Sequence, residues 1–222
     1  MAPSLARLGQ HCNQPSKRLP GMPWERERPT RLTQWLHLAQ SGRGRRSGQA
    51  WASRKAWLWH VAMSLESVRA WLRANAPDLP ILETEASTAT VLEAAEALGV
   101  VPGQIAKTLA LRVGDRVLLL VTRGDARLDN QKTKAAFAAR PRMLDAQETL
   151  ALTGHPIGGV CPFGLAMPLP VYCDLSLKAF DLVYPAAGSL NSSVCVAPGP
   201  LAALVAARWI DICRLPEPDP AG

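Results

Sequence analysis

The sequence predicts a single α+β domain built around a curled mixed β-sheet that is flanked by helices. Strand and helix signals are mixed along the chain and do not follow the regular βαβ rhythm of a parallel fold. A length of 222 residues leaves room for one ordinary domain. We expect that domain at 63–215, a disordered basic extension at 1–62, and a frayed, proline-rich tail at 216–222.

The first half of the domain carries clear start and stop signals. Ser64 is expected to cap a helix that runs to about residue 76, and a short strand is expected at 81–85. A capping box at Thr90 predicts a helix that ends at Gly99. Residues 105–113 and 116–122 then predict two strands, joined by the tight turn signal Gly114-Asp115.

The second half contains shorter elements around a long loop. Asp129 is expected to cap a helix through Ala138, and Asp145 with Glu148 predicts a second capping box for a helix that ends before Gly154. Eight of the eighteen residues at 153–170 are Gly or Pro, which predicts a shaped loop. Beyond it, strands are expected near 171–173, 182–184, 193–196 and 209–213, and a helix at 200–207.

The formal net charge of +7 is unevenly distributed. Residues 1–62 carry a net charge of +9, and the remainder carries −2. The extension is therefore either a basic tail that touches RNA, an organelle transit peptide, or a segment upstream of a true start at Met63. We favour the third interpretation, because a regular hydrophobic pattern begins at that methionine and none precedes it.

Five cysteines and the absence of any C-x-x-C pair argue against a disulfide framework or a zinc ribbon. The sequence contains no run of 18 apolar residues, so no membrane-spanning helix is expected. A reducing cytoplasm fits the cysteine content best. We expect no metal and no cofactor, because His155, Cys161 and Cys173 do not have a standard ligand spacing.

Two segments could carry chemistry. Lys107 lies between Ile105 and Leu109 on one face of a predicted strand, where a lysine is unusual unless it is paired or reaches water. Gly158 and Gly159 leave backbone amides unshielded in the long loop, where they could stabilise an oxyanion or serve only as a connector. A Cys161–His155 nucleophile and base pair is less favoured, because their spacing does not establish geometry.

A third feature is a local charge of +6 between Lys107 and Arg142, which suits phosphate groups. Each member could equally belong to a solvated face with Asp125 and Asp129 as partners. The residues expected to contact nucleic acid are Arg123, Arg127, Lys132, Lys134, Arg140 and Arg142.

Three motifs together resemble the YbaK/ProX family of prolyl-tRNA synthetase-associated editing domains and their free-standing relatives. They are GQIAKTL at 103–109, RGDxRLD at 123–129 and TGHPxGGxxPFG at 153–164. The resemblance covers about 64–214 and implies a YbaK-like fold. It also implies hydrolysis of mischarged tRNA, commonly tRNA(Pro) that carries alanine or cysteine, without a metal or a protein nucleophile.

The resemblance also assigns roles to residues. Lys107 matches the family lysine, and 158–162 match the family's G-x-x-x-P loop, so Lys107, Gly158 and Gly159 are the expected catalytic residues. Thr88, His155, Val160, Cys161, Pro162 and Phe163 are the expected substrate-binding residues. The expected partners are tRNA, in particular tRNA(Pro), and prolyl-tRNA synthetase, with no membrane. The alternatives are a non-catalytic module that binds aminoacyl-tRNA or a nucleotide, and a Schiff-base enzyme built on Lys107.

Overall fold

The antiparallel hairpin of β2 (Ile105–Val113) and β3 (Arg116–Arg123) lies at the centre of the main sheet. The computed structural model describes residues 52–216, and side chains from Ser64 onward. The sheet order is β5-β2-β3-β6-β9, and β7 also pairs with β2. The flanking strands are β5 (Arg142–Met143), β6 (Val171–Asp174), β7 (Tyr184–Pro185) and β9 (Arg208–Ile210).

The sheet is mixed, as expected. β5 runs antiparallel to β2, whereas the β2–β7, β3–β6 and β6–β9 pairs are parallel. Two small antiparallel pairs lie outside it: β1 (Ile81–Glu83) with β8 (Ser192–Val194), and β4 (Arg127–Leu128) with β10 (Cys213–Arg214). The remaining elements are the helices α2 (Ala52–Asn75), α3 (Val91–Leu98), α4 (Asn130–Phe137), α5 (Ala146–Thr153) and α6 (Pro198–Leu204), and the 3₁₀ turns η2 (Pro102–Gln104) and η3 (Leu175–Ala179).

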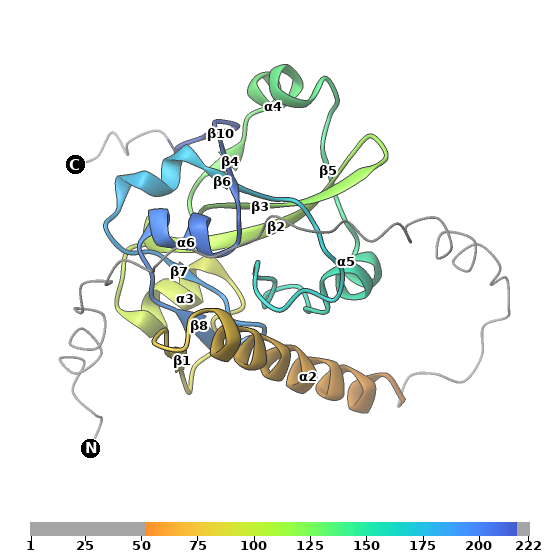
Figure 1. The fold of residues 1–222 in the computed structure, drawn as a ribbon, viewed down its shortest axis with the longest axis vertical. Coiled ribbons are helices and arrows are strands. Elements are labelled where there is room, and N and C mark those ends of the chain that lie inside the picture. The colour runs from red at the N-terminus through yellow and green to blue at the C-terminus, as the bar shows by residue number, and fades with distance from the viewer. Residues whose placement is uncertain (1–51, 217–222) are drawn as a thin grey trace, which may run out of the picture. The chain divides into compact units, whose positions relative to one another are not determined.

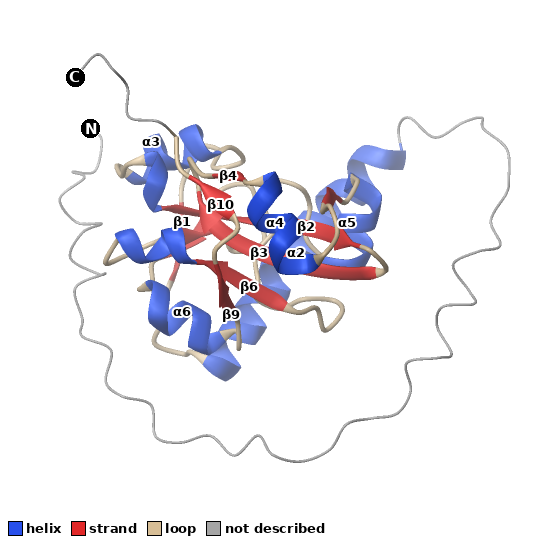
Figure 2. Ribbon diagram, turned by 90° about the horizontal axis from the view of Figure 1, so that it is seen from above, coloured by secondary structure: helices blue, strands red, loops and turns tan. Residues whose placement is uncertain are grey.

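Both faces of the hairpin are buried, because successive side chains of a strand point to opposite faces. Ala106 and Ala110 join the core that includes Val68 and Leu72 of α2. Leu111 and Val113 join a second core, against which Phe137 of α4 packs. Figure 1 shows α2 and α4 on opposite sides of the hairpin, and Figure 2 shows helices around the strands. The predicted α+β architecture is confirmed.

Several predicted boundaries are confirmed because they depend on local chemistry. Thr90 and Glu93 form the reciprocal capping box of α3, and Gly99 ends that helix with a left-handed φ of 67°. Asp129 caps α4 by accepting from the amides of Gln131 and Lys132. The loop that follows α5 contains neither helix nor strand up to Pro170.

The predicted start of the first helix is wrong. α2 begins at Ala52, so Ser64 is an interior residue of the helix, and the expected domain boundary at 62/63 falls inside it. Ser64 is buried, and its hydroxyl contacts His155 instead of capping the helix. The rest of the expected extension, residues 1–51, lies outside the described residues, as does the expected tail from residue 217.

Two further predictions are corrected by tertiary contacts. Asp145 caps α5, but the reciprocal half of the expected box is absent, because Glu148 pairs with Arg112 at 2.6 Å. The single strand expected at 209–213 is divided into β9 and β10. Asp174 lies at the division, where its Oδ2 accepts from the amides of Ile212 and Cys213 at 3.0 and 3.1 Å.

Asp174 is buried and bridges three backbone amides, since its Oδ1 also accepts from Ser176. We therefore expect Asp174→Ala to lower the free energy of unfolding by about 2–4 kcal/mol, because buried N–H donors lose charge-assisted partners. Urea unfolding followed by circular dichroism measures this. The matched control is Asp181→Ala, at an exposed aspartate, which should change stability by less than about 0.5 kcal/mol. Equal losses in the two variants would contradict the assignment.

Candidate functional site

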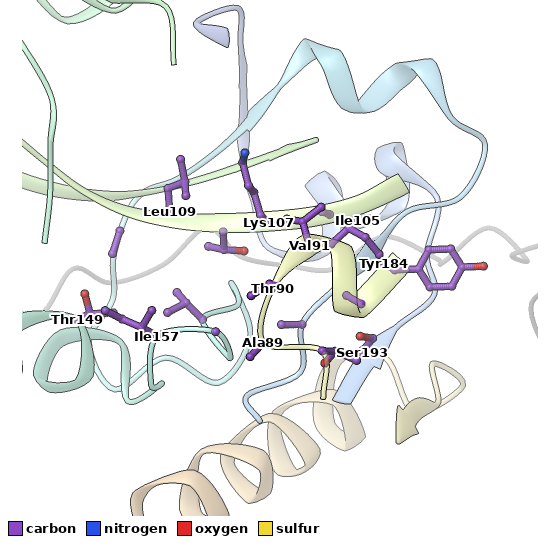
Figure 3. A pocket seen from close by; sticks show the side chains of 18 of the residues that line it. Ala89, Thr90, Val91, Ile105, Lys107, Leu109, Thr149, Ile157, Tyr184 and Ser193 are labelled. Carbon is purple, nitrogen blue, oxygen red and sulfur yellow. The ribbon is translucent and has the colours of Figure 1, made fainter. Parts of the chain in front are cut away.

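A pocket of about 290 Å³ lies between the edge of β2 and the loop that follows α5. Residues 105–110 of β2 form one wall, and the start of α3 forms another. The loop contributes Ile157, Gly158 and Val160, and Met143 comes from β5. The exposed lining is mainly apolar. Figure 3 shows these elements converging around the cavity.

The pocket lies beside a gap in the edge of the sheet. β7 pairs with β2 at Ile105 and Ala106, and β5 pairs with it at Leu111 and Arg112. The carbonyl of Ala110 accepts from the amide of Leu144 at 3.0 Å. Within residues 52–216, no strand pairs with this edge of β2 in between, so part of the β2 backbone is available to a ligand.

Lys107 lines the pocket, but its ammonium group points elsewhere. Its Nζ donates to the carbonyls of Gly124 and Ala126 at 2.8 and 2.5 Å. Figure 3 shows the Lys107 side chain on the opposite side of β2 from Ala89 and Thr90. Burial lowers the pKa of Lys107, while the nearby Cys213 and Asp125 oppose that shift. Lys107 therefore ties β2 to the turn that follows β3.

The loop at the pocket contains a tight turn. The amide of Gly159 donates to the carbonyl of Pro156 at 2.9 Å, and Gly158 between them has a φ of +91°. This positive φ requires glycine at the third position of the turn. The Gly159 amide is used inside the loop, so of the two glycine amides only that of Gly158 is a candidate donor to a ligand.

The two glycines are also needed for packing. A Cβ atom on Gly158 would lie 2.8 Å from Leu190, and one on Gly159 would lie 3.0 Å from the backbone of Gly188. Gly158 lines the pocket, whereas Gly159 does not. Substitution at Gly159 would therefore act through the fold before it acted on a ligand.

His155 is fully buried and holds the loop in place. Its Nδ1 lies 2.5 Å from the Ser64 hydroxyl, and its Nε2 lies 2.8 Å from the Phe163 carbonyl. Burial lowers the pKa of His155, and the bond to Phe163 partly opposes that shift. His155 thus connects α2 to two points of the loop, its start and Phe163, and it does not line the pocket.

Cys161 and Phe163 belong to the hydrophobic core and have no exposed surface. Burial raises the pKa of Cys161 to about 12, so its thiol is neutral near pH 7. Its Sγ lies 3.6 Å from Nε2 of His155, a distance that suits a weak contact inside the core. A neutral, fully buried thiol is a poor nucleophile, which argues against the Cys161–His155 alternative.

The structure thus divides the residues that the sequence singled out. Thr88, Lys107, Gly158 and Val160 line the pocket together. His155, Cys161 and Phe163 lie behind it in the core, and Pro162 lines a second, more open cavity next to Trp71. Sequence reasoning missed the pocket residues Thr108, Thr149, Ile157 and Met143. Only Thr108 had a usable signal, because it follows Lys107 in the first motif.

The basic residues also divide into two groups. Arg123 is partly buried. Its guanidinium group forms a bidentate pair with Asp125 at 2.9 and 2.6 Å and lies over the Phe180 ring. Lys132 pairs with Asp211 at 2.7 Å. The remaining four are exposed and have no ion pair in the described part of the chain; they are Arg127, Lys134, Arg140 and Arg142.

Among the residues that the structure describes, no group of three His, Cys, Asp or Glu side chains is arranged to hold a metal ion. In the same residues, no helix is both long and apolar enough to cross a membrane.

Comparison with known proteins identifies the family to which the chain belongs. Residues 85–204 match the model of the aminoacyl-tRNA editing domain. The uncharacterized protein YwhH of Bacillus subtilis is 48% identical over 158 residues, which cover 68% of this chain and 98% of that protein. The proline–tRNA ligase of Shouchella clausii is 30% identical over 168 residues, which cover 72% of this chain but only 29% of the ligase.

A solved structure gives the same answer for the fold. The crystal structure of a proposed trans-editing enzyme for prolyl-tRNA synthetase superposes with a TM-score of 0.63 and 34% identity. The match covers 68% of this chain and 97% of that one. The YbaK-like fold expected from the sequence motifs is therefore confirmed.

Burial of His155 predicts a pH-dependent stability. The unfolded chain takes up a proton at this residue near pH 6.5, whereas the folded protein takes it up only at lower pH. The contribution of His155 to the free energy of unfolding should therefore be complete above pH 6.5. The free energy should fall as the pH drops below 6.5, by at most about 1.4 kcal/mol per pH unit.

Urea unfolding between pH 7.5 and 5.5 measures this, with His155→Gln as the matched control, since the other three histidines are common to both proteins. The glutamine variant should show a smaller drop. A drop of equal size in the two proteins would assign the effect to other groups.

Proposed function

The chain belongs to the aminoacyl-tRNA editing domain family, and on that premise we propose that it hydrolyses the ester of mischarged tRNA in trans. The proposed substrate is a small amino acid, such as alanine or cysteine, on tRNA(Pro). The observation that carries the proposal is the pocket beside β2, whose volume of about 290 Å³ is at the low end for ligand sites. In this proposal its mainly apolar walls admit a small side chain and exclude a larger one.

The chemistry requires little from the protein. An ester has a fair leaving group, so a positioned water, or a hydroxyl of the substrate itself, can attack if the carbonyl is oriented and its developing charge is stabilised. The amide of Gly158 is one candidate donor. The fully buried Cys161 does not take part as a nucleophile in this proposal.

We assign Lys107 a positioning role. Its bonds to the carbonyls of Gly124 and Ala126 fix β2 at the point where the strand borders the pocket. Loss of Lys107 would loosen the pocket wall, and misplacement by about 1 Å can reduce a rate about 100-fold.

The four exposed basic residues are the proposed tRNA contacts. Arg127 lies on β4 opposite Arg214 of β10, and Arg142 is next to the pocket residue Met143. Arg123 is less suited to this role than the sequence indicated, because Asp125 and Phe180 occupy its guanidinium group. Prolyl-tRNA synthetase remains a proposed partner, and the cytoplasm the proposed location.

The Schiff-base alternative meets a geometric obstacle. A substrate carbonyl in the pocket would lie on the side of β2 that faces Thr90, whereas Lys107 extends to the other side (Figure 3). Borohydride trapping with a carbonyl substrate tests this alternative. A binding module would retain aminoacyl-tRNA without releasing the amino acid, so turnover separates it from an enzyme.

The first test is deacylation by the full chain of tRNA(Pro) charged with alanine, cysteine, serine, threonine, 2-aminobutyrate or proline. We expect turnover of the small amino acids and none of proline. Lys107→Ala should lower kcat at least about 100-fold. The matched control is Lys178→Ala, since Lys178 is exposed and lies over the Trp209 ring away from the pocket. Normal turnover by a folded Lys107→Ala protein would refute the role of this lysine.

The second test concerns tRNA affinity. Arg127→Gln and Arg140→Gln should each flatten the log–log dependence of tRNA binding on salt by about 0.7–0.9, because each removes one phosphate contact. The matched control is Arg73→Gln on the exposed side of α2, which should leave the slope unchanged. If all three substitutions change the slope equally, tRNA does not bind at the proposed residues.

A further inference from the structure

Thr108 is the residue of β2 that faces the gap in the sheet. Within an antiparallel strand, alternate residues direct both their N–H and C=O groups to the same edge. Ala106 and Arg112 pair with β7 and β5 on this edge, and Ala110 bonds to Leu144 there. Thr108 belongs to the same alternating set and lies between them.

The backbone of Thr108 is therefore unpaired on this edge. On the opposite side of β2, Lys107 and Leu109 are the residues whose backbones face β3, while Thr108 and Val121 are opposite each other without bonding. Neither polar backbone group of Thr108 has another partner within residues 64–216. Thr108 also lines the pocket, so its N–H and C=O border the cavity.

The side chain of Thr108 adds a third polar group. Its Oγ1 has almost no exposed surface and no hydrogen-bond partner among the residues that the structure describes. Because Lys107 extends away from Thr90 and Ala89, the next side chain along the strand lies on their side of β2 (Figure 3). To meet a ligand in the cavity, the hydroxyl would have to turn about the Cα–Cβ bond to another staggered position.

We propose that the aminoacyl group of the substrate pairs with Thr108 as one residue of an added strand would. The α-ammonium group donates to the Thr108 carbonyl and hydroxyl, and the Thr108 N–H donates to the ester carbonyl oxygen. An aminoacyl ester carries a donor, its ammonium group, and an acceptor, its carbonyl oxygen, on one residue. These two groups complement the C=O and N–H of Thr108 at the free edge. This assignment rests on the proposed deacylase function and makes Thr108 the residue that anchors the amino acid.

The pairing accounts for two features of the site. It places the ester carbonyl against a fixed N–H donor, which can stabilise an oxyanion as the ester is attacked. It also gives a reason for the unpaired buried hydroxyl of Thr108, which lowers stability unless a ligand supplies its hydrogen-bond partner. Thr108 selects for the α-amino group, while the apolar walls limit the size of the side chain.

Single-turnover deacylation of alanyl-tRNA(Pro) by Thr108→Val and Thr108→Ser tests the hydroxyl. Valine has the same shape but no hydroxyl, so kcat/KM should fall about 10-fold or more, and serine should restore most of it. The melting temperature of Thr108→Val should equal or exceed that of the wild type, since the unpaired hydroxyl is removed. Wild-type kcat/KM in the valine variant, or loss of activity together with loss of folding in both variants, would overturn the proposal.

A change in the substrate tests the ammonium group. In lactyl-tRNA(Pro) a hydroxyl replaces the ammonium, and the measured rates are divided by the uncatalysed rate for each ester. The effect of Thr108→Val should shrink to about 2- to 3-fold with the lactyl ester, because the charged partner is gone. The same penalty with both esters would show that Thr108 does not contact the ammonium group.

A binding measurement distinguishes failure of the Thr108 assignment from failure of the proposed deacylase function. Calorimetry compares adenosine that carries a 3′-alanylamide with adenosine that carries a 3′-lactylamide. If the wild type shows no deacylation but binds the alanyl compound more tightly, and Thr108→Val abolishes the preference, the function fails and the Thr108 assignment stands. If deacylation occurs but neither the substitution nor the ligand changes affinity, the assignment fails and the function stands. Absence of both activity and binding overturns both.

Discussion

The antiparallel ladder between β2 and β3 is the constraint on which the rest of this structure depends. It fixes alternate residues of both strands on two faces, and both faces are buried against helices. A polar residue in either strand must then find a partner inside the protein or at the edge of the sheet. Lys107 finds its partners in the carbonyls of Gly124 and Ala126, whereas Thr108 is left at the gap between β5 and β7.

The loop across the pocket owes its shape to contacts with distant parts of the chain. Ser64 of α2 and the Phe163 carbonyl hold both nitrogens of His155, and Phe163 itself packs against Trp71 with ring centroids 5.5 Å apart. A neutral, fully buried imidazole suits this structural role. The turn at Gly158 is thereby held against the pocket, although its own sequence is rich in glycine.

The site as a whole uses fixed backbone groups and neutral side chains. Its walls are mainly apolar, its thiol is buried, and the ammonium group of Lys107 is engaged by two carbonyls. Such an arrangement can orient an ester and exclude a larger side chain, and it leaves long-range attraction of a polyanion to the exposed arginines and lysines. Recognition of the amino acid and affinity for the tRNA would then be separable properties of the molecule.

The sequence by itself determined the features that depend on neighbouring residues. Thr90 and Glu93 cap α3 within a single turn, and Gly114 and Asp115 close the hairpin, so the α+β class and the approximate limits of β2 and β3 followed from local chemistry. The motifs around Lys107 and Gly158 likewise identified two segments that border the pocket.

Only the tertiary structure decided which atoms face the pocket. Ser64 looked like a helix cap and Glu148 like half of a capping box, but each bonds to a residue far away in the sequence, His155 and Arg112 respectively. Thr108 lies in the first motif, but the sequence could not show its free edge, because that edge exists only where β5 and β7, from distant parts of the chain, leave a gap. Local patterns specify turns and caps, whereas the partner of a buried polar group depends on which elements pack together.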